Sequence, residues 1–251
     1  MTDPLFDLAG KIACVTGASA GLGEFSARFL AQNGVSVVGV ARRQDRLEHW
    51  QQTAGGCTAV VVADLARTAD VSGIADQVCD CFGPPDILIN AAGINTRETA
   101  DEVTPEGWAM TLDLNLSAPF FLAQSFARGM QDKGWGRIIN FASLQTFRAF
   151  PGGIAYGASK AGVGQMTRAM AEAWSPHGIT ANAIAPGFIK TELTAAVFDD
   201  PDRSARNAAQ TCIGRNGTVE DLAGPIQFLC SNASAYVTGQ VLCVDGGYTA
   251  K

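Results

Sequence analysis

Short apolar runs and longer amphipathic stretches alternate along the whole chain. Apolar runs at residues 11–16, 35–40, 58–62, 86–89, 137–141, 179–184 and 240–244 predict strands. The stretches between them, at residues 21–33, 43–53, 68–82, 104–133, 154–174 and 219–230, are typical of helices. Because the strands are apolar throughout, we expect helices on both faces. The pattern predicts an α/β fold with one doubly wound, parallel, seven-stranded sheet, formed by residues 1–251 as a single domain.

Residues 188–217 interrupt this alternation. The segment is polar, contains the sequence Asp199-Asp200-Pro201-Asp202, and has only a weak helical pattern. It is long for a connection between a strand and a helix. Such a segment is either disordered or a lid over a ligand site, and we expect a substrate lid.

A glycine-rich turn follows the first predicted strand and opens the first helix. Glycine permits a sharp turn and a close approach to a pyrophosphate, and a helix N-terminus supplies N–H groups. Residues 17–21, Gly-Ala-Ser-Ala-Gly, also fit the G-x-S-x-G turn of serine hydrolases. Two features argue against a hydrolase: only one strand precedes the turn, and the downstream histidine, His177, lies at a helix end. The turn therefore favours a dinucleotide on a Rossmann-type sheet, with contacts from Gly17, Ser19, Ala20, Gly21, Leu22 and Gly23.

The end of the second strand indicates which dinucleotide is bound. NAD sites usually place an acidic residue there, whereas this chain has Ala41 followed by Arg42 and Arg43. A guanidinium group can hold a ribose 2′-phosphate with two hydrogen bonds. The sequence therefore favours NADP(H) and leaves NAD(H) open. Asp64, with Leu65 beside it after the third strand, can accept a hydrogen bond from the adenine amino group.

Four polar residues form a candidate catalytic set. Tyr156 and Lys160 are spaced i and i+4, so they share one face of a helix. Ser143 ends the fifth strand, and Asn115 lies midway along the preceding helical stretch. Residues 90–93, Asn-Ala-Ala-Gly, end the fourth strand. Ligands of doubly wound sheets bind at these carboxyl ends.

Together these motifs resemble the short-chain dehydrogenase/reductase family, in its form of about 250 residues. The resemblance covers the whole chain and extends to Asn182 and to Asp245-Gly246-Gly247. Ala91 stands where the family usually has asparagine. The family implies further cofactor contacts from Asn90, Ala91, Gly93, Tyr156, Lys160, Pro186, Gly187, Ile189 and Thr191.

The resemblance also implies a role for each member of the catalytic set. Tyr156 would be the general acid or base that exchanges a proton with the substrate oxygen. Because an ordinary tyrosine has a pKa near ~10, Lys160 would lower the pKa of the phenol, and it would also hold the nicotinamide ribose. Ser143 would bond the substrate oxygen, and Asn115 would position a water that links Lys160 to solvent.

The substrate is less well defined by the sequence. Beside Ser143 and Tyr156, candidate contacts are Arg97, Gln145 and Arg148, and two arginines suggest an anionic substrate. The stretch 92–97 resembles sugar-acid members of the family, such as gluconate 5-dehydrogenases and 2-deoxygluconate 3-dehydrogenases. Phe147 and Phe150 also allow an apolar cyclic ketone. Alternatives are a 3-oxoacyl-carrier-protein reductase and, in another class, a non-catalytic dinucleotide-binding protein.

Composition narrows the classes of partner. The net charge of -6 argues against nucleic acid and anionic membranes as partners. The chain has two histidines, which predicts no metal site, and seven cysteines without a C-x-x-C pair, which are typical of free thiols in the cytoplasm. No signal peptide or membrane-length apolar run is apparent. The family resemblance implies a homotetramer.

Overall fold

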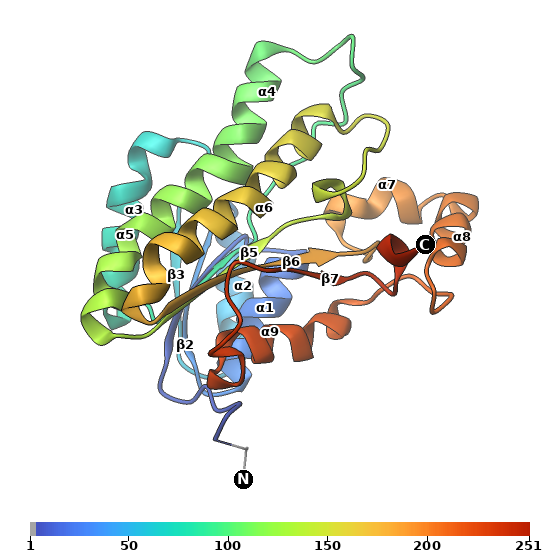
Figure 1. The fold of residues 1–251 in the computed structure, drawn as a ribbon. Coiled ribbons are helices and arrows are strands. Elements are labelled where there is room, and N and C mark those ends of the chain that lie inside the picture. Colours follow the sequence, from blue (N-terminus) through green and yellow to red (C-terminus); the bar gives the residue numbers. More distant parts are fainter. Residues whose placement is uncertain (1–3) are drawn as a thin grey trace.

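Seven parallel strands form the central layer of the protein (Figure 1). The structure, a computed structural model, describes residues 4–251. The strands are β1 (Ile12–Thr16), β2 (Ser36–Ala41), β3 (Thr58–Val62), β4 (Ile87–Asn90), β5 (Gly136–Phe141), β6 (Ile179–Pro186) and β7 (Val241–Val244). Their order in the sheet is β3-β2-β1-β4-β5-β6-β7. The predicted fold class is confirmed.

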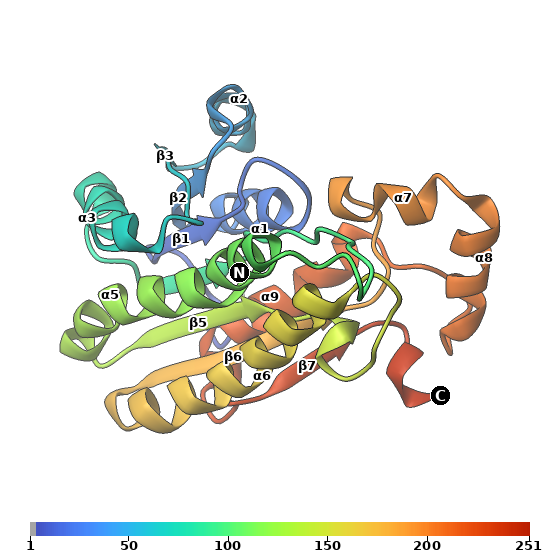
Figure 2. The same ribbon diagram turned by 90° about the horizontal axis from the view of Figure 1, so that it is seen from above.

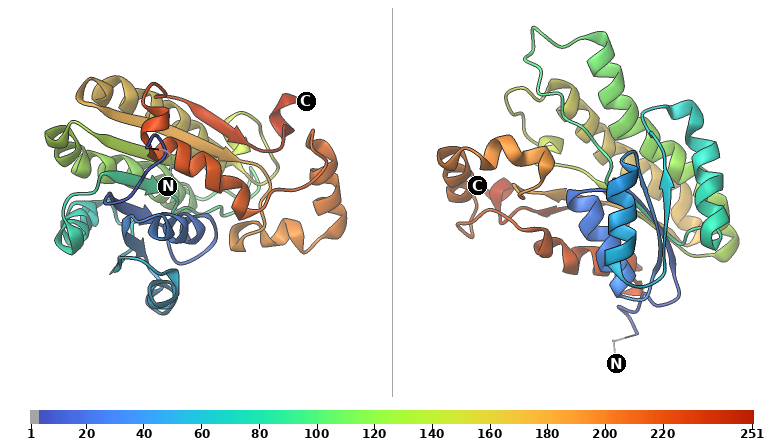
Figure 3. Two further views of the ribbon diagram at one scale, coloured as in Figure 1. Left: turned by 90° about the horizontal axis from the view of Figure 1, so that it is seen from below. Right: turned by 180° about the vertical axis from the view of Figure 1, so that it is seen from behind.

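Helices cover both faces of the sheet, as Figures 2 and 3 show. One layer contains α1 (Gly21–Gln32), α2 (Gln44–Ala54) and α9 (Ala223–Cys230), and the other contains α3 (Val71–Phe82), α5 (Ala118–Lys133) and α6 (Ile154–Trp174). Leu30, Trp50 and Leu229 belong to the buried cluster of the first layer, and Phe126 and Met170 to that of the second. The two apolar clusters explain why the strands are apolar on both faces.

The chain reverses its direction of winding between β1 and β4, which are neighbours in the sheet. The turns after these two strands therefore separate to opposite sides and leave room at the carboxyl edge. Thr16, the last residue of β1, links the ends of these two strands. Its Oγ1 accepts hydrogen bonds from the N–H groups of Ala91 and Ala92, both at 3.0 Å. The site is therefore expected at this edge.

The single helix predicted over residues 104–133 is interrupted. Thr104 caps α4 (Pro105–Leu112) by accepting a hydrogen bond from the N–H of Gly107 at 3.0 Å. A π-helical segment, Asp113–Ser117, separates α4 from α5. Such insertions are rare and frequently mark functional sites. Asn115 lies in this segment. The spacing of apolar residues in the sequence does not reveal that the helix changes to a π-helix here.

The segment 188–217 folds into two helices that project beside the sheet, next to the C-terminal end (Figures 1 and 2). These are α7 (Ala195–Phe198) and α8 (Pro201–Gln210). Asp200 caps α8 by accepting a hydrogen bond from the N–H of Arg203 at 3.0 Å. No residue of α8 is buried, so the helix does not contribute to the apolar core. The alternative of disorder is wrong for this segment.

No helix within residues 4–251 combines the length and the apolar character needed to span a membrane.

Candidate functional site

A cavity of about 740 Å³ opens at the carboxyl ends of the strands. Most of the predicted site residues line it, from the glycine turn at one end to the segment after β6 at the other. The predicted residues on its wall are Gly17, Ser19, Ala20, Gly21, Leu22, Gly23, Arg42, Arg43, Asp64, Leu65, Ala91, Gly93, Arg97, Ser143, Gln145, Tyr156, Pro186, Gly187, Ile189 and Thr191. The structure thus brings together residues that are far apart in the sequence.

The glycine turn has the geometry needed for a pyrophosphate. Gly17 has φ +72°, and a Cβ there would lie 2.9 Å from the backbone nitrogen of Ala92. A Cβ at Gly23 would lie 2.4 Å from the carbonyl oxygen of Gly17, so only glycine allows this close packing. Ala20, at the N-cap of α1, provides no side-chain cap. The first N–H groups of α1 therefore remain available for an anion.

Two arginines lie at the glycine-turn end of the cavity. Arg43 donates from Nε and Nη2 to the Oγ of Ser19, at 3.3 and 3.2 Å, and from Nη1 to Glu192 at 2.8 Å. Arg42 lies 3.7 Å from the carboxylate of Asp64. The guanidinium of Arg43 and the hydroxyl of Ser19 thus face one point, which suits a ribose 2′-phosphate.

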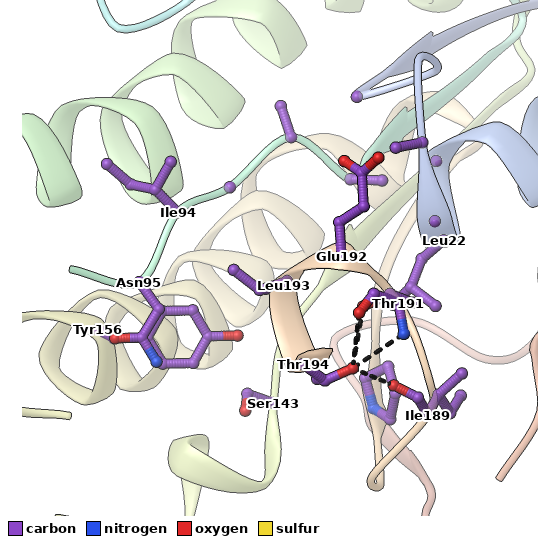
Figure 4. Close-up of a pocket in the computed structure, with 18 of the residues that line it drawn as sticks. Leu22, Ile94, Asn95, Ser143, Tyr156, Ile189, Thr191, Glu192, Leu193 and Thr194 are labelled. Carbon is purple, nitrogen blue, oxygen red and sulfur yellow. Dashed lines mark hydrogen bonds between the residues drawn. The ribbon is translucent and has the colours of Figure 1, made fainter. Parts of the chain in front are cut away.

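Ser143 and Tyr156 form the polar centre of the other end of the cavity. Ser143 follows β5, and its Oγ accepts a hydrogen bond from the N–H of Gln145 at 3.1 Å. Burial raises the pKa of Tyr156, whereas a hydrogen bond with Ser143 and the charge of Arg97 act in the opposite direction on that pKa. Figure 4 shows Ser143 below Tyr156. The phenol is therefore held in its protonated form at neutral pH.

Lys160 lies behind the cavity wall. It is buried, its Nζ donates to the carbonyl oxygen of Phe141 at 2.7 Å, and that Nζ is 5.6 Å from the centroid of the Tyr156 ring. Burial lowers the pKa of Lys160 to about 8. Burial, Ser143 and Arg97 set the direction of the Tyr156 pKa in the structure, so the lowering of that pKa by Lys160 stays a prediction.

Asn115 is buried and holds the loop after β4 in place. Its Oδ1 accepts from the N–H of Ile94, and its Nδ2 donates to the carbonyl oxygen of Ile94, both at 2.9 Å. Its Nδ2 also lies 3.1 Å from the Oγ of Ser159, whose hydroxyl donates to the carbonyl oxygen of Tyr156. The side chain thus joins the loop to the helix that carries Tyr156. The water that Asn115 was expected to position remains a prediction.

Besides Lys160 and Asn115, two more predicted site residues do not lie on the cavity wall. The side chain of Asn90 is buried, and its Nδ2 donates to Asn140 at 2.9 Å. Arg148 lies over the ring of Tyr248 and donates to the carbonyl oxygen of Lys251. The structure therefore assigns Asn90 to the interior and Arg148 to the surface beside the C-terminal end.

The serine-hydrolase alternative is not supported by the geometry. His177 lies in the short turn before β6, at the amino ends of the strands. Ser19 lies at the carboxyl ends, on the cavity wall. A nucleophile and its base must lie within hydrogen-bonding distance of each other. His177 therefore cannot activate Ser19.

The contribution of α8 to the cavity was not predicted from the sequence. Arg203, Arg206, Asn207 and Gln210 line the wall from this helix, and Phe150 and Phe188 line it nearby. The ring centroids of Phe150 and Phe188 lie 6.0 Å apart. The Asp-Pro pair at 200–201 signals the helix start, but nothing in the sequence indicates which face of α8 meets the site. Besides Arg42 and Arg43, the cavity wall therefore has three more arginines, Arg97, Arg203 and Arg206.

Comparisons with known proteins agree with this geometry. A family model described as enoyl-(acyl carrier protein) reductase matches residues 17–249. The 2-dehydro-3-deoxy-D-gluconate 5-dehydrogenase of Escherichia coli is 41% identical, over 98% of each chain. The chain belongs to the short-chain dehydrogenase/reductase family. The dehydrogenases of this family are oxidoreductases that act on CH–OH groups.

Further family members share its full length. The gluconate 5-dehydrogenase of Gluconobacter oxydans is 40% identical and covers 98% of this chain and 97% of its own. A 3-oxoacyl-[acyl-carrier-protein] reductase of Vibrio cholerae is 36% identical, over 96% of this chain and 98% of its own. The predicted family membership is confirmed.

Solved structures of the family have the same fold. A gluconate 5-dehydrogenase of Burkholderia cenocepacia, in complex with NADP and tartrate, has a TM-score of 0.92 at 36% identity, over 99% of this chain and 98% of its own. A candidate NAD(P)-dependent gluconate 5-dehydrogenase of Beutenbergia cavernae, with NADP bound at low occupancy, has a TM-score of 0.93 at 39% identity, over 98% of this chain and 100% of its own. NADP is thus the dinucleotide present in both of these neighbours.

Proposed function

We propose that this protein is an NADP(H)-dependent dehydrogenase/reductase that interconverts a ketone and a secondary alcohol on a sugar acid. The observation that carries the proposal is the composition of one cavity, which combines the glycine turn and Arg43 with Ser143, Tyr156 and three further arginines. The bound NADP found in two structural neighbours supports the cofactor. The names of the sugar-acid relatives support the substrate class.

The chain's own residues perform the proton chemistry. When bound, NADP(H) supplies the hydride to the carbonyl carbon in reduction and accepts it in oxidation. In reduction, the phenol of Tyr156 gives its proton to the carbonyl oxygen as that oxygen gains negative charge. Ser143 donates a second hydrogen bond to the same oxygen and stabilises the developing alkoxide. In oxidation, Tyr156 first gives its own proton to the path through Lys160 to solvent, and the resulting phenolate then removes the hydroxyl proton.

Lys160 and Asn115 support this proton transfer. With a pKa lowered to about 8 by burial, the Lys160 ammonium can lose and regain a proton near neutral pH, which suits a proton path from solvent to Tyr156. Its donors can also hold the nicotinamide ribose. Asn115 fixes the loop at Ile94 beside the cavity, so that the nicotinamide end and the catalytic set keep one geometry.

The arginines favour an anionic substrate over a neutral ketone. Arg97 has φ +58°, a strained conformation for a non-glycine residue, and it donates to the carbonyl oxygen of Leu193 at 2.5 Å. Arg203 and Arg206 reach the same cavity from α8. A guanidinium group binds a carboxylate through two hydrogen bonds. A sugar acid offers a carboxylate together with hydroxyls for Asn95 and Gln145 nearby.

A panel of substrates with both cofactors tests the proposal. We expect turnover of 5-keto and 2-keto sugar acids with NADPH, and lower kcat/KM with NADH. Faster turnover of acetoacetyl thioesters would assign the chain to the 3-oxoacyl-carrier-protein reductases, which also include a full-length relative. Preference for alicyclic ketones would indicate that the phenylalanines dominate the site. Binding of NADPH without turnover of any ketone would identify a non-catalytic protein.

The proposal also covers the lid, the assembly and the compartment. We take residues 188–217 as a substrate lid, because α7 and α8 contribute Val197 and Arg206 to the cavity wall.

The seven cysteines are free thiols, which supports a reducing cytoplasm. Exposed apolar side chains on the long helices, Phe121 and Ile154 among them, support a homotetramer. Light scattering measures the mass of the assembly directly.

A further inference from the structure

Glu192 connects the lid to the cofactor end of the cavity. It follows β6, whereas Arg43 follows β2, and the two side chains meet with 2.8 Å between Oε2 and Nη1. A second arginine, Arg46, lies 3.6 Å from the other carboxylate oxygen. In Figure 4 the carboxylate of Glu192 points away from Leu193 and Thr194, toward the side of the cavity formed by the glycine turn. The carboxylate of a lid residue thus forms ion pairs with two arginines at the cofactor end of the cavity.

Arg43 is shared between this anion and the cofactor site. Its Nε and Nη2 are directed at the buried Ser19, and its Nη1 is directed at Glu192. A ribose 2′-phosphate held by Ser19 and Arg43 would therefore be placed beside the carboxylate of Glu192. Two anions on one guanidinium repel each other, and each reduces the affinity of the other.

The partners of Glu192 leave it free to move. Its side chain is 51% exposed and that of Arg43 is 44% exposed. Exposed ion pairs of this kind contribute little to stability. A phosphate carries more charge than a carboxylate and can replace it as the partner of Arg43. Glu192 therefore acts as a competitor that can be displaced, rather than as a fixed structural bridge.

We propose that Glu192 sets the preference of this protein between NADP(H) and NAD(H) by competing with the 2′-phosphate for Arg43. The proposal rests on the proposed use of NADP(H). NAD(H) has no 2′-phosphate, so it leaves the Glu192–Arg43 pair intact. The competition therefore lowers the affinity for NADP(H) selectively.

The test compares two adenosine fragments that differ at the 2′ position. Binding of 2′,5′-ADP and of 5′-AMP is measured by isothermal titration calorimetry on the full chain and on its Glu192→Gln variant. The glutamine keeps the size of the side chain and removes its charge. We expect Glu192→Gln to bind 2′,5′-ADP about two- to fivefold more tightly, the range of an exposed ion pair, and to bind 5′-AMP unchanged.

Two further variants make the result specific. Glu48→Gln also removes one carboxylate, from α2. Within residues 4–251 Glu48 accepts a hydrogen bond from Gln44 and forms no ion pair with an arginine, so we expect this variant to leave the ratio of the two affinities unchanged. In an Arg43→Ala background, Glu192→Gln should lose its effect on 2′,5′-ADP, because the group for which the two anions compete is absent. Thermal unfolding verifies that each variant is folded.

The outcomes separate this proposal from the proposed function. If the native chain prefers 2′,5′-ADP and Glu192→Gln leaves that preference unchanged, the competition is refuted and the NADP(H) assignment stands. An equal gain in affinity for 2′,5′-ADP and 5′-AMP also refutes the competition, because the charge of Glu192 then affects adenosine binding in general and not the 2′-phosphate. If neither the native chain nor the variant prefers 2′,5′-ADP, the NADP(H) assignment itself fails.

Discussion

The side chain of Asn115 and the backbone of Ile94 exchange two hydrogen bonds, each of 2.9 Å. This relationship ties a π-helical segment to the loop after β4. A Cβ at Gly93 would lie 3.1 Å from the Asn115 Oδ1, so the loop approaches the helix as closely as glycine allows. The backbone N–H and carbonyl of Ile94 would otherwise lack partners at the edge of the cavity. Asn115 is therefore a positioning residue as well as a candidate for the proton path.

Replacement of Asn115 by alanine should reduce both stability and activity. The variant loses three side-chain hydrogen bonds, to the backbone of Ile94 and to Ser159, and leaves buried groups without partners. We expect the free energy of unfolding in urea to fall by about 2–4 kcal/mol. Asn33→Ala is the control, because Asn33 makes one side-chain bond, to Phe29, far from the cavity. A full loss of activity at unchanged stability would show that positioning of the loop is not the cause.

Tyr156→Phe should abolish proton transfer and keep the cofactor site. The change removes one hydroxyl, so we expect kcat to fall by at least about 100-fold, while NADPH binding measured by fluorescence changes little. The control is Tyr236→Phe, because Tyr236 is fully exposed on the surface. Turnover of the Tyr156 variant within a few fold of the native rate would overturn the assignment of the acid/base.

The sequence predicts the fold and most of the cavity because both depend on local signals. Apolar runs give the strands, and the glycine turn and the Tyr156–Lys160 spacing place groups at the carboxyl edge. Long-range contacts are less accessible to this reasoning. The contact between Arg43 and Glu192 joins residues 149 positions apart, and it depends on how the lid folds back. Two further features depend on the assembled fold. These are the face of α8 that lines the cavity and the raised pKa of Tyr156, on which burial has a larger effect than charge.

Lys160 should make stability depend on pH in the alkaline range. Burial lowers its pKa from 10.5 to about 8, so between these values the unfolded chain binds a proton that the folded chain does not. Stability attributable to this group therefore rises with pH between about 8 and 10.5, by at most about 1.4 kcal/mol per pH unit. Below pH 8 the lysine is charged in both states, and its burial has a constant cost.

The difference between the native chain and Lys160→Met isolates this effect. Methionine keeps much of the side-chain volume, and the other titrating groups contribute equally to both proteins. Unfolding in urea is measured at several values between pH 7 and 10. The native chain should gain stability relative to Lys160→Met as the pH rises above 8. A difference that is constant over this range would mean that the pKa of Lys160 is not lowered in the folded state.

Gly23→Ala and Gly73→Ala should have opposite effects, although both glycines lie in helices. A Cβ at Gly23 would lie 2.4 Å from the carbonyl oxygen of Gly17 and 2.8 Å from that of Thr16, and backbone atoms cannot move aside without opening the turn. We expect Gly23→Ala to destabilise the protein by about 1–3 kcal/mol and to weaken NADPH binding at least about tenfold. A Cβ at Gly73 meets nothing within 4 Å, so Gly73→Ala should be neutral or stabilise α3 by up to about 1 kcal/mol, with NADPH binding unchanged. Thermal unfolding and fluorescence titration measure the two effects. If Gly23→Ala bound NADPH as tightly as Gly73→Ala, the turn after β1 would not be the pyrophosphate site.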